Sequence, residues 1–366
     1  MPTVADVVAY LDRFAPPALA AEWDNVGLLA GDPVWAANRI LTCLTVTPDV
    51  VDEAVAERVE LIVAHHPVMF RGVKKLTPHT PDGRVLLPLL RQGIAVYSPH
   101  TSFDNCPGGI NDGLARRLGL TDVQPLRKVT SKPECKLVVF VPEADLTKVS
   151  DTMFAAGAGT IGQYEQCSFR VPGTGTFFGT DTTNPTVGVK GRRENVSEWR
   201  LEVVVPERKI EAVIAAMRQS HSYEEPAFDV YPLRPKTTGG EWRIGQLPAP
   251  IPLRELAKLT KAQLNANGVQ LVGVPGKLVH RVAIACGAAG EFLPDAISAK
   301  ADVFLTGEIR FHDCLTAAAN IAVILPGHYA TERPGIEDLA VQLATAFPAT
   351  TVTASRRERD PLSWQL

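Results

Sequence analysis

The first third of the chain alternates short apolar runs with segments of helical periodicity. The runs "RILTCLTVT" (39–47), "LIVA" (61–64) and "IAVYS" (94–98) are rich in apolar and β-branched residues and predict buried strands. Between them, segments 48–58 and 83–92 place apolar residues at helical spacing. Strands that alternate with helices predict βαβ units and a mostly parallel sheet.

The same alternation returns in the last third of the chain. Strands are predicted over "HRVAIAC" (280–286), "DVFLTGE" (302–308) and "IAVILPG" (321–327), and a helix over "GIEDLAVQLATAF" (335–347). Because the first and last thirds share this pattern and the middle does not, we predict one α/β body that is split by an inserted module.

An internal repeat marks the middle of the chain. Segment "KLVVFVPEADLTKVSDTM" (136–153) aligns with "RLEVVVPERKIEAVIAAM" (200–217), and in both a period-2 strand meets a proline at the start of a helix. β-rich stretches follow the two copies at 163–171 and 227–233. Two βαβ copies of this size predict a ferredoxin-like sandwich. The alternative is a chance similarity between two amphipathic units.

Polar stretches flank this repeat. "RKVTSKPE" (127–134) and "RPKTTGGE" (234–241) have the composition of linkers. We place the domain boundaries in these two stretches. The predicted organisation is an α/β part at 1–128, an inserted ferredoxin-like α+β module at 129–238, and a second α/β part at 239–366.

Composition is that of an ordinary soluble globular protein. The 366 residues are 45% hydrophobic and 21% charged, with a net charge of −3, and no basic stretch argues for nucleic acid as a partner. No apolar run is long enough to span a bilayer, and the N-terminus predicts an amphipathic helix capped by Thr3 rather than a signal peptide. The six cysteines are scattered without a C-x-x-C pair, which predicts reduced thiols and a cytoplasmic location.

Histidines and carboxylates gather where the predicted strands end. His65 and His66 follow "LIVA", His100 follows "IAVYSP" and His328 follows "IAVILPG". The carboxyl ends of parallel strands border the crevice in which α/β proteins bind ligands. The acidic residues that accompany these histidines are Asp104, Glu308 and Glu332.

Two adjacent histidines can serve one centre only where the backbone turns. Neighbouring residues of a strand point to opposite faces, but Pro67 directly after His66 ends strand pairing and predicts such a turn. Imidazole combined with carboxylate suits zinc, iron or manganese. Two adjacent histidines, a third histidine and two carboxylates are too many for one structural zinc, and they fit a two-metal site better.

Each feature also has a simpler interpretation. An isolated His-His pair is usually an ordinary loop pair, and His328 with Glu332 could form a hydrogen-bonded pair at the start of the last helix. His312, four residues after Glu308, could support a metal ligand or act as an acid/base residue. "CGAAG" (286–290) could bind an anion through backbone N–H groups, but no complete phosphate-binding motif is present.

A series of motifs resembles the NIF-three-like proteins (NGG-one-interacting factor three). The motifs are "EWDNVGLLAGDP" (22–33), "AHHP" (64–67), "SPHTSFDN" (98–105), "TGEI" (306–309) and "GHYATERPGI" (327–336). The resemblance covers both outer segments. It implies a two-domain α/β fold, a di-metal centre, and a toroidal homohexamer whose sites face an inner cavity. The middle segment resembles the PII/CutA-like insert of longer bacterial members.

The resemblance also implies roles for residues of this chain. Two divalent metal ions per subunit, of zinc, iron or manganese, would be held by His65, His66, Asp104, His328 and Glu332. His100 and His312 are similar to nearby polar residues of the family, and they are the candidates to move protons. One departure is Thr45, at a position where the family often carries aspartate and where a polar support of the sheet is expected.

Many bacterial members of this family bear the name GTP cyclohydrolase I type 2 homologue, which implies metal-assisted hydrolysis that opens a purine ring. The leading hypothesis is therefore a metal-dependent hydrolase acting on an unidentified small molecule. The alternative is a metal-binding regulatory or scaffold protein, or a metal chaperone, because PII/CutA-like modules commonly trimerise and sense small ligands. A partner of transcription factors is a third hypothesis, and it rests on the family name alone.

Overall fold

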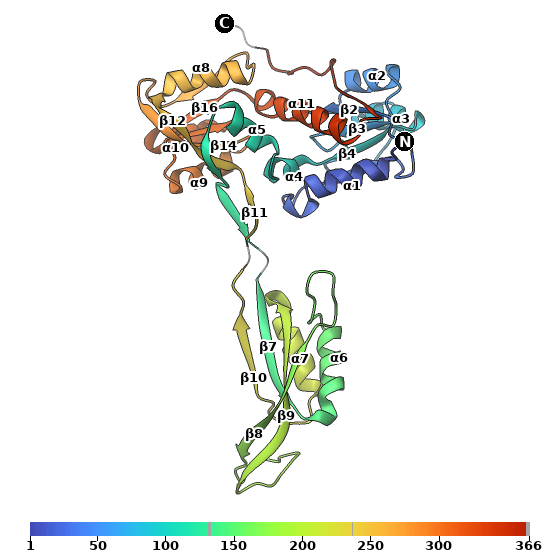
Figure 1. Ribbon diagram of the computed structural model, residues 1–366, viewed down its shortest axis with the longest axis vertical. Helices are drawn as coiled ribbons and strands as arrows, with labels where there is room; N and C mark the ends of the chain where they lie inside the picture. Colours follow the sequence, from blue (N-terminus) through green and yellow to red (C-terminus); the bar gives the residue numbers. More distant parts are fainter. Residues whose placement is uncertain (131–132, 236, 364–366) are drawn as a thin grey trace. The chain divides into compact units, whose positions relative to one another are not determined.

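The computed structural model describes residues 1–130, 133–235 and 237–363, and it divides the chain into two compact units (Figure 1). One unit, here called the body, combines Met1–Val129 with Gly239–Leu366, and the other, the inserted unit, is Thr130–Thr238.

The stretches predicted as linkers contain strands. β6 (Arg127–Thr130) and β11 (Thr237–Glu241) pair with each other where the chain passes between the units. Positions 131, 132 and 236 of these stretches lie outside the described residues. Polar composition alone therefore predicted a linker where backbone pairing forms a ladder.

A mostly parallel sheet forms the first layer of the body, as predicted. Its strand order is β1-β4-β3-β2-β17, in which β1 is antiparallel to β4 and the other neighbours are parallel. The strands are β1 (Gly27–Ala30), β2 (Arg39–Cys43), β3 (Leu61–Ala64), β4 (Ala95–Ser98) and β17 (Thr351–Ala354). β3 and β4 are buried at every position, which explains why they appear in the sequence as continuous apolar runs.

A second sheet of the body has the order β13-β16-β15-β14-β12-β5. The predicted strands β14 (Leu278–Ala285), β15 (Val303–Thr306) and β16 (Ala322–Leu325) are parallel and central. The antiparallel strands around them, which sequence patterning did not identify, are β5 (Thr121–Gln124), β12 (Arg243–Pro252) and β13 (Gln270–Val272).

The N-terminal and C-terminal segments of the body each contribute a strand to the other segment's sheet, and this exchange makes them one unit. β5 comes from the N-terminal segment but pairs with β12, whereas β17 comes from the C-terminal segment but pairs with β2. One hydrophobic core contains residues from both segments, such as Val4, Phe103 and Ile336. The predicted split α/β body is confirmed, and it fixes residues far apart in the sequence against each other.

Helices cover the sheets of the body, and several begin at capping residues. The predicted cap Thr3 accepts a hydrogen bond from the backbone N–H of Asp6. None of the helices in the described ranges is long and apolar enough to cross a membrane. The helices of the body are α1 (Val4–Phe14), α2 (Pro48–Ala56), α3 (Pro81–Arg91), α4 (His100–Asn105), α5 (Ile110–Arg117), α8 (Leu253–Gln263), α9 (Leu293–Ser298), α10 (Phe311–Asn320) and α11 (His328–Ala346).

The inserted unit has a ferredoxin-like βαββαβ order, as the repeat predicted. Its elements are β7 (Glu134–Val141), α6 (Leu146–Ala155), β8 (Phe169–Phe178), β9 (Arg193–Pro206), α7 (Ile210–Ser220) and β10 (Phe228–Pro232). The sheet order is β10-β7-β9-β8, all antiparallel, and α6 and α7 pack side by side against one face (Figure 1). Within the β-rich stretch at 163–171 the strand begins only at Phe169, and Ile161 and Tyr164 close a tight turn before it.

Candidate metal centre

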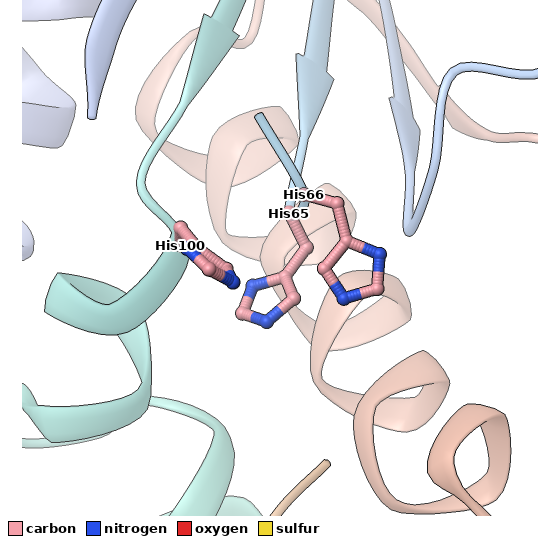
Figure 2. A group of neighbouring side chains, drawn as sticks. All are labelled: His65, His66 and His100. Atoms are coloured by element: carbon pink, nitrogen blue, oxygen red, sulfur yellow. The ribbon is translucent and has the colours of Figure 1, made fainter. Parts of the chain in front are cut away.

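The chain bends where it leaves β3, and the bend brings two imidazoles to the same side. The backbone N–H groups of His65 and His66 still donate to the carbonyl oxygens of Cys43, the last residue of β2, and of Leu44 after it, at 2.9 and 2.8 Å. Their ring centroids lie 5.1 Å apart. Figure 2 shows both rings at the strand end, extending into the same space as His100. His65 is fully buried, whereas the His66 side chain is 26% exposed.

Helix α4 follows β4 and presents two further side chains to this space. His100, its first residue, places its ring centroid 5.2 Å from that of His65 and 5.6 Å from that of His66. Asp104 lies one helical turn later, and its Oδ1 is 3.6 Å from His65 Nε2. Asp104 is buried. The parallel pairing of β3 with β4 is what brings the two strand ends, and hence these residues, together.

Helix α11 supplies an imidazole and a carboxylate from the other end of the chain. His328 and Glu332 are four residues apart on its first turns, and Glu332 Oε2 lies 3.0 Å from His328 Nε2. The same oxygen is 3.1 Å from His66 Nε2, while Glu332 Oε1 is 3.8 Å from His65 Nε2. The two carboxylate oxygens of Glu332 therefore face different imidazoles.

Several of these polar atoms make no hydrogen bond of good geometry among the described residues, although some of them lie close to one another. They include both ring nitrogens of His65, Nε2 of His328 and Oε2 of Glu332, all buried. A buried polar atom without a partner costs about 1–3 kcal/mol, so a group of them needs compensation. Ligand atoms of His65, His66 and His100 lie within 4.8 Å of one another, as do those of His66, His328 and Glu332. Such converging lone pairs fit a bound cation.

Burial and proximity set the charge of the cluster. Burial, reinforced by the carboxylate of Glu332, raises the pKa of Asp104 to about 7. Burial acts in the same direction on Glu332, but the imidazoles around it, led by His328, outweigh burial and lower its pKa. Burial lowers the pKa of His65 well below its usual value, which keeps that imidazole neutral and able to bind a metal. A divalent cation would supply the positive charge that protons otherwise bring.

His328 shows the opposite balance. Burial by itself lowers its pKa, but the hydrogen bonds and charges of Glu332 and Glu308 outweigh burial and raise the pKa to about 9. Its Nδ1 lies 3.0 Å from Glu308 Oε1. This contact leaves Nε2, which lies 3.0 Å from Glu332 Oε2, directed at the cluster, as is usual for a histidine that binds a metal.

Asp24, which sequence reasoning did not single out, orients His100. Its Oδ1 lies 2.7 Å from His100 Nδ1, and its Oδ2 accepts hydrogen bonds from the backbone N–H, at 3.1 Å, and the hydroxyl of Thr101. Burial raises the pKa of Asp24, but the bonds from His100 and Thr101 outweigh burial and lower it to about 2. Asp24 occurs in "EWDN", a loop before β1, and only the resemblance of that motif could have indicated it.

Thr45 supports His66 from the end of β2. Its Oγ1 lies 2.7 Å from His66 Nδ1. A hydroxyl therefore occupies the place where the resemblance led us to expect a carboxylate, and the polar support is present in a neutral form. The carboxylate of Glu358 accepts a hydrogen bond from the backbone N–H of Thr45, at 2.6 Å. The contact of Glu358 with Thr45 could not be inferred from the sequence, because the two residues lie 313 positions apart.

The loop after β14 approaches the cluster closely. The thiol of Cys286 donates to Asp104 Oδ1 at 3.1 Å, and burial raises the pKa of Cys286 well above its usual value. The N–H of Gly287 donates to Thr331 Oγ1 at 3.0 Å, so this part of "CGAAG" is not available to the predicted anion. Gly287 has φ +66°, and a Cβ there would lie 2.3 Å from Glu332 Oε1. Only glycine fits beneath the carboxylate.

The cluster opens into a cavity of about 420 Å³. Aromatic side chains form part of its wall: the Trp23 ring centroid lies 5.9 Å from that of His100 and 5.6 Å from that of Phe70. The structure does not bring His312 into this group. His312 is exposed on α10, where its ring lies beside Phe311, and it is not among the described residues that line the cavity.

The chain is similar to known proteins over almost all of its length. The model of the Duf34/NIF3 (NGG1p interacting factor 3) family matches residues 2–361. A Mycobacterium tuberculosis protein named GTP cyclohydrolase 1 type 2 homolog is 39% identical over 353 residues, which cover 95% of this chain and 93% of that protein. A Halalkalibacterium halodurans protein of the same name is 37% identical over 365 residues and 98% of each chain. The crystal structure of a Bacillus cereus protein related to NIF3 aligns with a TM-score of 0.68 and 32% identity, covering 100% of this chain and 99% of that one.

Proposed function

This chain belongs to the Duf34/NIF3 family, and from that premise we propose that it is a hydrolase that depends on two divalent metal ions. The observation that carries the proposal is the set of buried nitrogen and oxygen atoms that converge without hydrogen bonds of good geometry among the described residues. The proposed metal ligands are His65, His66, Asp104, His328 and Glu332. When bound, zinc, iron or manganese would supply a hydroxide at neutral pH and a Lewis acid for the substrate.

The carboxylate of Glu332 supports a pair of ions rather than one. Its Oε2 faces His66 and His328, and its Oε1 faces His65, so that each oxygen belongs to a different group of imidazoles. The two sets of candidate ligands share His66, and one of them includes His100. Asp104 adds negative charge beside His65.

His100 is the residue that we assign to proton transfer. Asp24 engages its Nδ1, which directs the other ring nitrogen toward the cluster. Burial by itself lowers the pKa of His100, but the hydrogen bond to Asp24 and the charges of Asp104, Asp24 and Glu332 together outweigh burial and raise the pKa, which favours the protonated ring. His312 stays a prediction as a proton carrier, and its exposed position on α10 gives it no contact with the metal ligands in the described structure.

The proposed substrate is a small molecule with a planar ring. The relatives are named GTP cyclohydrolase 1 type 2 homolog, which suggests hydrolysis of a purine ring. Trp23 and Phe70, 59% and 49% exposed, stand beside His100 at the cavity and could stack on such a ring. We include in the proposal the cytoplasmic location and the homohexameric toroid that the resemblance implies. Native mass spectrometry measures the assembly directly.

A metal-binding regulatory protein or metal chaperone is the second candidate. The inserted unit is compact and has its own hydrophobic core, so it could sense a ligand independently of the body. His66 and His328 are 26% and 33% exposed, which would allow a metal to exchange with a partner. Tight metal binding without turnover of any substrate would favour this candidate.

Metal content and turnover of the untagged protein test the proposal. We expect about two metal ions per chain, and hydrolysis of one compound in a screen of nucleotides and phosphoesters with zinc, iron or manganese. Glu332→Gln should lose metal and activity together, because it removes the charge between the imidazoles. His79→Ala, at an exposed histidine, is the control. A Glu332→Gln variant with full metal content by elemental analysis would contradict the ligand assignment.

A further inference from the structure

The inserted unit contains a cavity of its own, of about 440 Å³. It lies between the β8–β9 hairpin and the segment that joins α7 to β10, and the described residues that line it belong to this unit. The volume falls within the roughly 300–1,000 Å³ typical of small-molecule sites. Nothing in the proposed reaction uses this cavity.

Aromatic rings and a tethered loop form its walls. Phe140 of β7 and Phe177 and Phe178 of β8 are among the residues that line it. The loop between β8 and β9 is held against the segment after α7, because Thr186 Oγ1 donates to Ser222 O at 2.8 Å. The backbone N–H of Asn184 also donates to Glu224 Oε1, at 3.1 Å. The cavity is therefore built by hydrogen bonds and is not only a gap between loops.

His221 fixes one end of the cavity. Its Nε2 lies 3.0 Å from the carbonyl oxygen of Phe140, and its Nδ1 accepts from the backbone N–H of Tyr223 at 3.0 Å. Both ring nitrogens are thus used, and the neutral Nε2–H tautomer is the one that satisfies both bonds. This bridge holds the Tyr223 backbone against β7 and so places the tyrosine ring at the cavity, with its centroid 4.9 Å from that of His221.

A carboxylate without a cation partner faces this cavity. Glu198 of β9 lies against Gly175 of β8, where a Cβ would come within 2.1 Å of its Oε2, so a larger residue at 175 would displace the carboxylate. The hydroxyl of Tyr223 is buried and has no hydrogen bond of good geometry among the described residues. Burial and the nearby Glu198 raise the pKa of Tyr223. The phenol therefore stays neutral beside the carboxylate.

The charge around the cavity is negative. Glu224 and Glu225 line it together with Glu198, and no lysine or arginine is among the described lining residues. Glu225 pairs with Arg218 at 3.3 Å, outside the lining. Arg200, whose guanidinium carbon lies 5.8 Å from the ring centroid of Phe140, is engaged by Glu202 at 2.8 Å. Glu198 is left without a counterion in the described part of the chain.

We propose that this cavity binds a small primary ammonium compound with an apolar body. The ammonium N–H groups would donate to Glu198, which has no cation partner among the described residues, and to the oxygen of the neighbouring Tyr223 hydroxyl. The faces of Phe140 and Phe177 attract a cation, and the same rings accommodate the apolar body. An anionic ligand would meet three carboxylates. A neutral ligand would leave Glu198 unpaired.

A charge series of similar shape tests this site in the full-length protein. The probes are phenethylammonium, 2-phenylethanol and phenylacetate, titrated by ligand-observed NMR with a chelator present, so that no metal ion can bind them. We expect saturable binding of the cation and at least tenfold weaker binding of the alcohol and the acid. Glu198→Gln should lower affinity for the cation at least tenfold and leave the alcohol unchanged.

Glu202→Gln is the matched control, because this residue lies four positions after Glu198 on β9 and already pairs with Arg200 and Lys136. It should not change binding of any probe. Circular dichroism melting curves show whether Glu198→Gln folds. If it does not, Tyr223→Phe replaces it, and we expect a severalfold loss of affinity for the cation alone. Equal affinity for the cation and the alcohol overturns the proposal. The proposal is also overturned if Glu198→Gln binds the cation as tightly as the wild type. It is likewise overturned if the wild type shows no saturable binding of the cation up to on the order of 10 mM.

Discussion

Replacement of Glu358 by glutamine shows how the fold holds two metal ligands against each other. The carboxylate of Glu358 accepts from Arg333 Nη1 and from the backbone N–H of Thr45, both at 2.6 Å. The Thr45 hydroxyl lies 2.7 Å from His66 Nδ1, and Arg333 directly follows Glu332 on α11. His66 Nε2 and Glu332 Oε2 are themselves 3.1 Å apart. The contacts among Glu358, Thr45, His66, Glu332 and Arg333 therefore form a closed ring of contacts.

The magnitude follows from burial. The side chain of Glu358 is 2% exposed and that of Arg333 is 13% exposed. Breaking a buried ion pair costs about 3–5 kcal/mol. Glutamine keeps an oxygen acceptor, and Arg333 keeps a contact with Glu337 at 3.2 Å, so we expect about 2–3 kcal/mol of lost stability. Loss of support for a metal ligand typically weakens metal binding about 10–100-fold, and we expect about tenfold for zinc.

Glu53→Gln separates the two effects. Glu53 is also a buried carboxylate that anchors the C-terminal segment, through the hydroxyl of Ser355 and, at 2.8 Å, the backbone N–H of Arg356. It has no described contact with Thr45 or with a metal ligand. We expect urea unfolding of the chelated protein to show losses in both variants, and competition with a zinc indicator to show weaker binding only in Glu358→Gln. Equal zinc affinity in the two variants would refute the claim that Glu358 supports the metal ligands through Thr45 and Arg333.

Three further outcomes are expected. Burial by itself raises the pKa of Glu53, but the hydrogen bonds that Glu53 accepts outweigh burial and lower the pKa below the usual value of 4.5. The charged carboxylate therefore stabilises the fold above pH 4.5, and this stabilisation is lost as the pH falls through the lower folded pKa. The difference in urea midpoint between wild type and Glu53→Gln should therefore shrink on acidification. Gly287→Ala should lose bound metal by elemental analysis, because its Cβ would lie 2.3 Å from Glu332 Oε1. Asp24→Asn should lower kcat about 100-fold with metal content unchanged, because His100 loses its orienting partner.

The histidines of the candidate site could be predicted because each follows an apolar run. His65, His66, His100 and His328 are placed by strand ends, and strand ends are visible in the periodicity of the sequence. The side-by-side position of these ends then follows from the parallel pairing of βαβ units. His312 was also a candidate, because it lies four residues after Glu308. In the structure His312 lies on α10 and is exposed.

The supporting residues could not be predicted in this way. Asp24 reaches His100 from an irregular loop, and Glu358 reaches Thr45 across 313 positions of the chain. Both contacts are made by side chains to partners that no local pattern specifies. The exchange of β5 and β17 between the sheets was missed for a related reason, since the pairing of edge strands is decided by tertiary contacts rather than by propensity.

Anomalous diffraction from crystals grown with manganese or zinc tests the central claim most directly. The account predicts a pair of anomalous peaks, roughly 3.5–4 Å apart, bounded by His65, His66, Asp104, His328 and Glu332. A map without anomalous density between these side chains, or imidazoles turned toward separate surfaces of the body, would contradict it.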